Sequence, residues 1–242
     1  MALVNITSDG YTCAASLSTT LCKKQLPMRF TIRSPVHKPY DESAGTLKVV
    51  RAAKLVFLRS GGAAFSIRGV AKEAGMSMGA LQHFYPTRDQ LVAAMLEFVT
   101  NEYEAEWERV CRDLPFNGED RLMRAIDYLA GDIQQQETRQ FFFSLWALSC
   151  HNKFAAALQD EMYAHHSRNM AAFVGAARPD FSERQCVEAA MQIVVLIDGL
   201  MLFTAPNTKH FSSRAAVARL IKRAVKKLIA AEEVVDLTAD IG

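Results

Sequence analysis

The stretch SIRGVAKEAGMSMGALQHFYPTRDQ, residues 66–90, carries the local signals for two short helices joined by a sharp turn. Ser66 and Ser77 each stand directly before a helical run, where a serine oxygen can accept from free backbone N–H groups. Gly75 lies between the two runs and tolerates the positive φ that such a turn requires. Pro86 ends the second run. This pattern predicts a helix-turn-helix, whose second helix can enter the major groove of DNA.

Helical patterns flank this stretch on both sides. From about Thr46 an apolar stripe recurs at spacings of three and four residues, and Gly61-Gly62 stops it. After the stretch, residues 87–90 read as a capping box that opens a longer helix. Basic side chains lie before, within and after the motif, namely Lys48, Arg51, Lys54, Arg59, Arg68, Lys72 and Arg88.

Residues 49–91 resemble the DNA-binding domain of the tetracycline-repressor (TetR) family of transcriptional regulators. Among the departures from the family pattern, Gln82 stands where the family most often has Tyr, and Met78 where it often has Lys. These departures concern the DNA sequence that is recognised more than the fold. The matched elements are Ala52-Ala53, Phe57, Gly61, Ser66–Ala71, Ala74–Ser77, Gly79–Leu81 and His83–Arg88.

The remainder of the chain is helical in pattern, with no strand run and no internal repeat. We therefore expect an all-α protein with an N-terminal helix-turn-helix, three-helix DNA-binding domain over residues 44–100. The resemblance implies that the larger C-terminal helical domain, residues 101–234, binds a ligand and dimerises. Residues 1–43 are expected to be a disordered basic tail and residues 235–242 a frayed C-terminus. The helices expected in the larger domain cover residues 119–135, 140–151, 154–175, 182–204 and 212–232.

Charge and cysteine content narrow the class of protein. Residues 1–95 carry a formal charge of +7 and residues 96–242 one of −5, so the basic front suggests an anionic partner such as nucleic acid. The longest stretch without a formal charge has 14 residues, which is too short for a membrane helix. The five cysteines form no CxxC pair, and the start lacks the basic and apolar regions of a secretory signal. We expect a cytoplasmic, nucleoid-associated protein with reduced thiols.

The helix-turn-helix offers side chains of the kinds that contact DNA. Gln can pair with adenine through two hydrogen bonds, Ser can reach a base or a phosphate, and Arg can fork onto guanine or a phosphate. Arg68 and Gln82 are the predicted base readers, whereas Lys54 and Arg88 are predicted to touch phosphate. The full set of predicted DNA-binding residues is Lys54, Ser66, Arg68, Ser77, Met78, Gly79, Gln82, His83, Tyr85, Thr87 and Arg88.

The apolar block around residues 141–146 has two interpretations, a packed core or the wall of a ligand cavity. The resemblance implies an apolar pocket between helices of the larger domain. Asp198 interrupts an apolar helix, and it is either a polar anchor for a ligand or a carboxylate paired to a neighbour, with the structural role favoured. The pocket is predicted to be lined by some of Phe142, Trp146, Met162, Met191 and Met201.

Signals for catalysis or metal binding are weak. Cys150 and His151 are adjacent in the sequence, so their side chains do not face each other on a helix. Glu161 and His165 have the spacing of two metal ligands, but a solvated polar turn is the simpler interpretation. We expect no enzyme activity, no metal and no cofactor.

The resemblance to the TetR family, together with these patterns, implies a ligand-responsive DNA-binding transcriptional regulator, most simply a repressor. It would bind a palindromic operator in double-stranded DNA and be released by a small-molecule effector that is largely apolar. The long apolar stripes in residues 182–204 and 212–232 predict a homodimer held by a four-helix bundle. The alternative is a helical scaffold or a helical enzyme whose basic front binds no specific DNA.

Overall fold

The computed structural model describes residues 43–112, 117–204 and 213–231, and every regular element in these ranges is an α-helix. The all-α prediction is therefore confirmed. The expected tail, apart from Ser43, and the expected frayed end at 235–242 lie outside the described residues. The helices are α1 (Ala44–Ala64), α2 (Ile67–Glu73), α3 (Met78–Phe84), α4 (Arg88–Arg112), α5 (Gly118–Asp132), α6 (Gln136–Ser149), α7 (Lys153–Ala177), α8 (Glu183–Met201) and α9 (Arg214–Ala230).

Local signals place the first three helices as the sequence predicts. The side-chain oxygens of Ser66 and Ser77 accept from the backbone N–H three residues further on, at 3.2 and 3.1 Å, so both predicted caps are confirmed. Gly75 has a φ of +60°, the left-handed conformation that the turn between α2 and α3 requires. Gly61 has a φ of +71° and breaks the helical geometry near the end of α1, where the sequence predicts the helix to stop.

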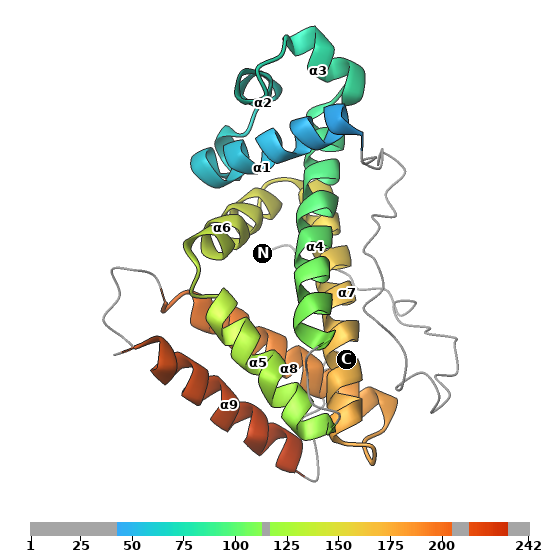
Figure 1. Ribbon diagram of the computed structural model, residues 1–242, viewed down its shortest axis with the longest axis vertical. Helices are drawn as coiled ribbons and strands as arrows, with labels where there is room; N and C mark the ends of the chain where they lie inside the picture. The colour runs from blue at the N-terminus through green and yellow to red at the C-terminus, as the bar shows by residue number, and fades with distance from the viewer. Residues whose placement is uncertain (1–42, 113–116, 205–212, 232–242) are drawn as a thin grey trace.

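α4 connects the helix-turn-helix to the rest of the molecule, as Figure 1 shows. The helix is continuous across residue 100, where the sequence predicts a domain boundary. Thr87 begins it by accepting from the backbone N–H of Gln90 at 3.2 Å. The predicted capping box is only half formed, because the buried side-chain Oε1 of Gln90 has no hydrogen-bond partner among the described residues.

The remaining helices form the lower part of the molecule in Figure 1, where α5, α8 and α9 lie farthest from α3. Ser182 and Gln185 form a capping box at the start of α8. Ser213 caps α9 by accepting from the N–H of Ala216 at 3.2 Å. No described helix combines the length and the apolar character needed to cross a membrane.

Two clusters of buried side chains hold these helices together. The first joins α1–α4 to α6 and α7, and Phe57, Leu81 and Phe141 are among its fully or almost fully buried members. The second joins α5, α7, α8 and α9. Phe142 on α6 packs against both clusters. The helix-turn-helix therefore shares its core with α6 and α7, and its position depends on theirs.

Candidate nucleic-acid interface and interior polar site

One surface of α3 is exposed at the end of the molecule. The predicted contact residues that lie on it are all exposed, namely Ser77, Met78, Gly79, Gln82 and His83. Leu81 in the same helix is completely buried, and this anchor fixes which face of α3 is turned outward. The arrangement leaves polar and small side chains available to a groove while the apolar side chains hold the helix in place.

The helices α2, α3 and α4 each begin at a serine or threonine cap. Ser66, Ser77 and Thr87, which cap them, are exposed. Each hydroxyl oxygen accepts a backbone N–H, so its own hydrogen is still available to donate to a phosphate. Arg68 in the first turn of α2 is also exposed. The DNA contacts predicted for Ser66, Arg68, Ser77 and Thr87 therefore stay predictions.

Tyr85 does not belong to the exposed surface. Its side chain is 1% exposed and is among the largest fully buried side chains of the protein. The prediction of a side-chain contact with DNA is wrong for this residue. Burial follows from the end of α3, because the chain leaves the helix in an extended conformation that turns the ring into the first core cluster.

Arg88 makes contacts within the protein, although the sequence predicted that it touches phosphate. Its guanidinium donates to the carbonyl oxygens of Gly62 at 2.9 Å and Phe65 at 3.2 Å, and it lies 5.9 Å from the centre of the Phe65 ring. These bonds satisfy carbonyls at the end of α1. The side chain therefore joins the start of α4 to the end of α1.

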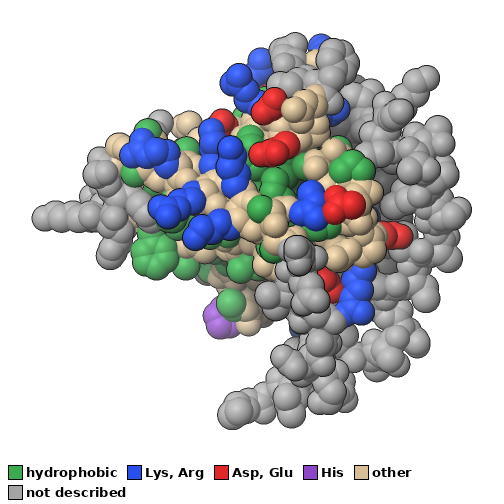
Figure 2. Space-filling model, turned by 90° about the horizontal axis from the view of Figure 1, so that it is seen from below, with side chains coloured by type: hydrophobic (Ala, Val, Ile, Leu, Met, Phe, Trp, Pro, Cys, Tyr) green, Lys and Arg blue, Asp and Glu red, His purple; other side chains and the backbone are tan. Residues whose placement is uncertain are grey.

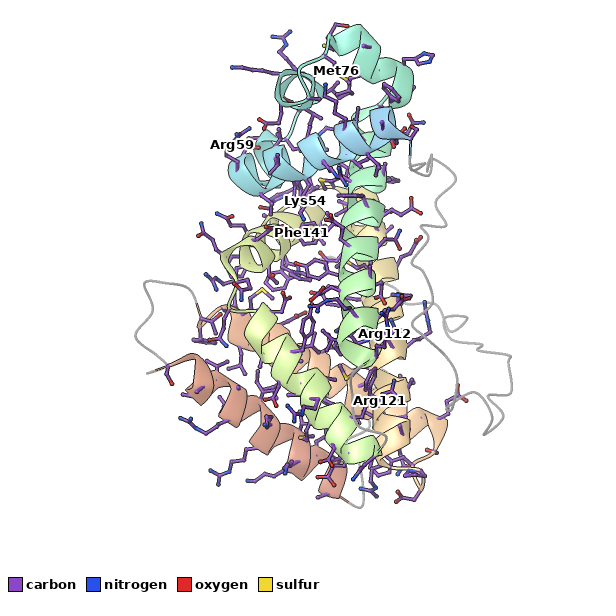
Figure 3. The ribbon with its side chains drawn as sticks, in the orientation of Figure 1. Lys54, Arg59, Met76, Arg112, Arg121 and Phe141 are labelled. Carbon is purple, nitrogen blue, oxygen red and sulfur yellow. The ribbon has the colours of Figure 1, made fainter. Side chains whose placement is uncertain are left out.

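Lys54 also departs from the prediction of a phosphate contact. Its ammonium group lies 2.8 Å from Glu102 of α4 and 2.8 Å from Glu137 of α6. Figure 3 shows Lys54 on the side of α1 that faces α6, away from α3. Burial alone lowers the pKa of Lys54, but the hydrogen bonds and the charges of the two carboxylates outweigh burial and raise it. The side chain stays charged and is held between two partly exposed carboxylates of the protein itself.

A row of aromatic side chains runs through the middle of the molecule between α4, α6 and α7. The Phe142 ring lies 6.4 Å from Tyr103 and 6.0 Å from Trp146. The indole Nε1 of Trp146 donates to the hydroxyl of Tyr163 at 3.0 Å. We call these four residues the aromatic row. Sequence reasoning found Phe142 and Trp146 but missed the two tyrosines, since they come from helices far apart in the chain.

Asp198 of α8 ends this row. Its carboxylate accepts from the hydroxyl of Tyr163, and burial raises the pKa of Asp198 to about 6 although that hydrogen bond opposes the shift. Burial, the charge of Asp198 and the bond to Asp198 also raise the pKa of Tyr163. Within the described ranges Asp198 has no ion-pair partner. Of the two roles that the sequence left open, pairing of the carboxylate to a neighbour is therefore the one seen, with Tyr163 as that neighbour.

The three predicted methionines do not converge on one pocket. Met162 packs at the edge of the first cluster, next to Tyr163 in the chain. Met201 is 1% exposed and belongs to the second cluster. Met191 is 41% exposed on the outside of α8, so its prediction as a pocket residue is wrong. A helical stripe alone does not tell which of its residues face inward.

An exposed apolar face follows α8. Val187, Met191, Val195 and Leu202 recur at spacings of four and seven residues, which places them on one side of the helix, and they are 38, 41, 66 and 57% exposed. Leu220 of α9 is 42% exposed. Apolar side chains exposed in such a continuous line are typical of a surface that another protein covers.

Basic side chains are not confined to the helix-turn-helix. The exposed side of α9 carries Arg219, Arg223, Lys226 and Lys227, and the helix contains no acidic residue. Figure 2 shows Lys and Arg side chains beside hydrophobic ones on the end of the molecule opposite α3. The N-terminal part of the sequence is basic and the remainder acidic, but the exposed basic side chains of α9 show that positive charge is not limited to the N-terminal part of the surface.

The structure also places the residues that the sequence analysis considered for metal binding and catalysis. His165 is buried in α7, with Nε2 3.1 Å from Glu104 of α4 and 3.2 Å from Asn169. It serves the contact between α4 and α7, and no group of three potential metal ligands forms among the described residues. Cys150 is exposed at the end of α6.

Comparison with known proteins matches both halves of the chain. The family model for "Bacterial regulatory proteins, tetR family" matches residues 49–95, and the model for "BetI-type transcriptional repressor, C-terminal" matches residues 118–230. The regulator PksA of Bacillus subtilis is 25% identical over 168 residues, which are 68% of this chain and 80% of that protein.

Solved structures show the same fold. A transcriptional regulator from Pseudomonas aeruginosa PAO1 has a TM-score of 0.67 at 19% identity, over 76% of this chain and 90% of that one. A regulator from Saccharomonospora viridis, determined in complex with choline, has a TM-score of 0.60 at 15% identity, over 78% and 97%. Together with the exposed, capped helix-turn-helix, these matches show that the chain belongs to the TetR family and is a DNA-binding transcriptional regulator.

Proposed function

We propose that the protein is a repressor that binds a palindromic operator as a homodimer and leaves it when a small, largely apolar molecule binds between α4, α6, α7 and α8. The observation that carries this proposal is the pairing of two features. One is an exposed α3 with a buried anchor, and the other is the aromatic row in the helices that hold α3 in place. The protein would act by binding rather than catalysis, in the cytoplasm at the nucleoid.

Arg68 and Gln82 are the proposed base readers, because both are exposed and the Arg68 guanidinium forms no ion pair among the described residues. Replacing either with Ala should cost about 1–3 kcal/mol on the preferred operator and relax base preference at particular positions. Fluorescence anisotropy on the operator, its single-base variants and a random duplex measures both effects. Arg223→Ala, at the other end of the molecule, is the matched control and should leave binding unchanged.

The exposed apolar face of α8, with Leu220 of α9, is the proposed dimer surface. Two such faces related by a two-fold axis would form a four-helix bundle. Val195 is the most exposed of its members, so Val195→Asp should place a charge at the contact without disturbing the core. Sedimentation should show a dimer for the wild type and a monomer for the variant. A variant that stays dimeric would exclude this face.

Asp198 favours a ligand that carries a positive charge as well as apolar groups. A carboxylate without an ion-pair partner beside aromatic rings is the environment that attracts organic cations. The choline complex of the regulator from Saccharomonospora viridis supports a small cation in this fold. Choline and a panel of hydrophobic amines should raise the melting temperature of the protein and release operator DNA. The variant Asp198→Asn should lose the response to cations but keep any response to neutral apolar compounds.

A further inference from the structure

Lys54 connects three helices that belong to different parts of the molecule. It projects from α1, and its ammonium group lies 2.8 Å from a carboxylate oxygen of Glu102 on α4 and of Glu137 on α6. The Lys54 side chain is 23% exposed, whereas the side chains of Glu102 and Glu137 are 45 and 59% exposed, so water screens the carboxylates more than it screens the ammonium group. We call Lys54, Glu102 and Glu137 the Lys54 clasp.

The two carboxylates of the clasp need the cation between them. Without Lys54, Glu102 and Glu137 would face each other as like charges, and their repulsion would push the N-terminal turn of α6 away from α4. With Lys54 in place, the same charges draw α4 and α6 toward α1. The clasp therefore makes the position of α1 depend on the distance between α4 and α6.

A second link joins α4 to α6 immediately beside the clasp. Tyr103 follows Glu102 in the chain and Thr138 follows Glu137, and the Tyr103 hydroxyl donates to Thr138 Oγ1 at 3.2 Å. The Thr138 hydroxyl donates in turn to Asp132 at 3.1 Å. Because Tyr103 belongs to the aromatic row, a molecule that enters this row presses on the same pair of helix turns that the clasp holds.

The end of α1 also rests directly on α6. A Cβ atom at Gly62 would lie 2.7 Å from the Leu148 Cβ and 2.7 Å from the carbonyl oxygen of Ser144, so only glycine permits this approach. Figure 3 shows Lys54 and Phe141 on the facing sides of α1 and α6. Movement of α6 is therefore passed to α1 through packing at one end and through the clasp at Lys54.

We propose that Lys54 is a positioning residue that fixes the helix-turn-helix at the orientation needed to engage both half-sites of an operator. A ligand that separates Tyr103 from Thr138 also separates Glu102 from Glu137, opens the clasp and changes the spacing of the two α3 helices in the dimer. This inference rests on the proposed dimeric repressor. It assigns to Lys54 an effect on the geometry of binding without any contact to DNA.

The test compares a full palindromic operator with a duplex that contains one half-site. Lys54→Met should lower affinity for the full operator about tenfold and affinity for the half-site less than twofold, since each α3 is intact but their spacing is not. The salt dependence of half-site binding should be unchanged, because no phosphate contact is lost. Equal losses on both duplexes, or a shallower salt dependence, would overturn the proposal, as would an unchanged affinity for the full operator.

Two further variants separate positioning from loss of fold. Lys54→Arg keeps a cation between the carboxylates and should bind the full operator as the wild type does. Adding Glu137→Gln to Lys54→Met removes the repulsion between the carboxylates, so affinity for the full operator should rise again. If the double variant binds no better than Lys54→Met, repulsion across the clasp is not the cause and the proposal fails.

A measurement without DNA keeps the clasp testable if the proposed dimeric function is wrong. In Lys54→Met, hydrogen exchange should rise at least several-fold in peptides that cover residues 136–140 and 50–58, and the double variant should reverse the rise. Exchange equal to that of the wild type would overturn the clasp. A wild-type protein that binds full operator and half-site equally would instead overturn the dimeric function.

Discussion

The surface of α2 and α3 and the interior around the aromatic row are built in opposite ways. The first takes its residues from one short stretch, between Ser66 and Thr87, and each cap bonds within three residues of itself. The second gathers Tyr103, Phe142, Tyr163 and Asp198 from four different helices. A site of the first kind is visible in local sequence signals, whereas a site of the second kind exists only after the helices have packed.

The adjacent residues Leu81 and Gln82 of α3 provide the strongest test of the locally determined orientation of this helix. Leu81 is fully buried, so Leu81→Ala should cost about 2–5 kcal/mol of unfolding free energy. Gln82 is exposed, so Gln82→Ala should change stability by less than about 0.5 kcal/mol while weakening operator binding. Urea unfolding at fixed protein concentration measures the first quantity and anisotropy the second. Comparable losses of stability in the two variants would contradict the orientation of α3.

Asp198 provides a pH-dependent test of the interior site. The folded protein holds the pKa of this carboxyl at about 6, above its unfolded value, so the contribution of Asp198 to stability is greatest below about pH 4 and is lost as pH rises to about 6. Relative to the wild type, Asp198→Asn should therefore gain up to about 3 kcal/mol between pH 4 and pH 7. Urea unfolding of both proteins at the two pH values measures this gain. A difference between them that does not vary with pH would show that the carboxyl is not buried as described.

The same site should show its pH dependence in ligand binding. Only the ionised carboxylate attracts a cation, so affinity for a hydrophobic amine should fall as pH drops below about 6, by as much as about tenfold per unit. Isothermal titration across pH 5 to 8 measures this slope, with Asp198→Asn as the control. An affinity that is equally high at pH 5 would remove Asp198 from the ligand site.

Substitution of Gly62 tests how closely α1 approaches α6, and substitution of Gly131 in α5 is the control. Gly62→Ala places a Cβ atom 2.7 Å from backbone and side-chain atoms of α6, and it should cost about 1–3 kcal/mol of stability. Gly131→Ala in α5 meets nothing within 4 Å and should instead stabilise by about 0.5–1 kcal/mol. Thermal or urea unfolding distinguishes the signs. Equal effects of the two substitutions would mean that α1 and α6 are farther apart.

Another modest effect is expected at the helix caps on the DNA side. Ser77→Ala removes the acceptor for the N–H of Ala80 and should cost about 1 kcal/mol of stability. Ser77→Asp keeps an acceptor, so stability should be retained, but its negative charge should repel phosphate and weaken binding to every duplex. Unfolding and anisotropy on the same pair of variants separate these roles. A Ser77→Asp variant that binds DNA normally would place phosphate away from this cap.

These contrasts also explain what could be predicted from the sequence. The fold class, the caps at Ser66 and Ser77 and the turn at Gly75 depend on local chemistry, and all were predicted. Tyr85 and Lys54 were misplaced because side chains next to a DNA-binding motif can point either to DNA or to the body, and only packing against α4 and α6 decides.

The interior site shows the same limit more strongly. The sequence pointed to Phe142 and Trp146 through their apolar block, yet it missed Tyr103 and Tyr163, which meet these rings only across helix contacts. Met191 was misplaced because α8 has an apolar stripe wider than its buried face. Periodicity identifies a stripe but does not divide it between a core and a surface that another chain covers.

Selection of bound sequences from a pool of random DNA duplexes tests the central claim most directly. If α3 reads bases and the apolar face of α8 pairs two copies, the wild-type protein should enrich one inverted repeat, with half-sites about one helical turn apart. Val195→Asp should enrich at most a single half-site. A pool in which the wild-type protein enriches no sequence would contradict sequence-specific recognition by α3, and enrichment of an unrepeated site would contradict the two-fold dimer.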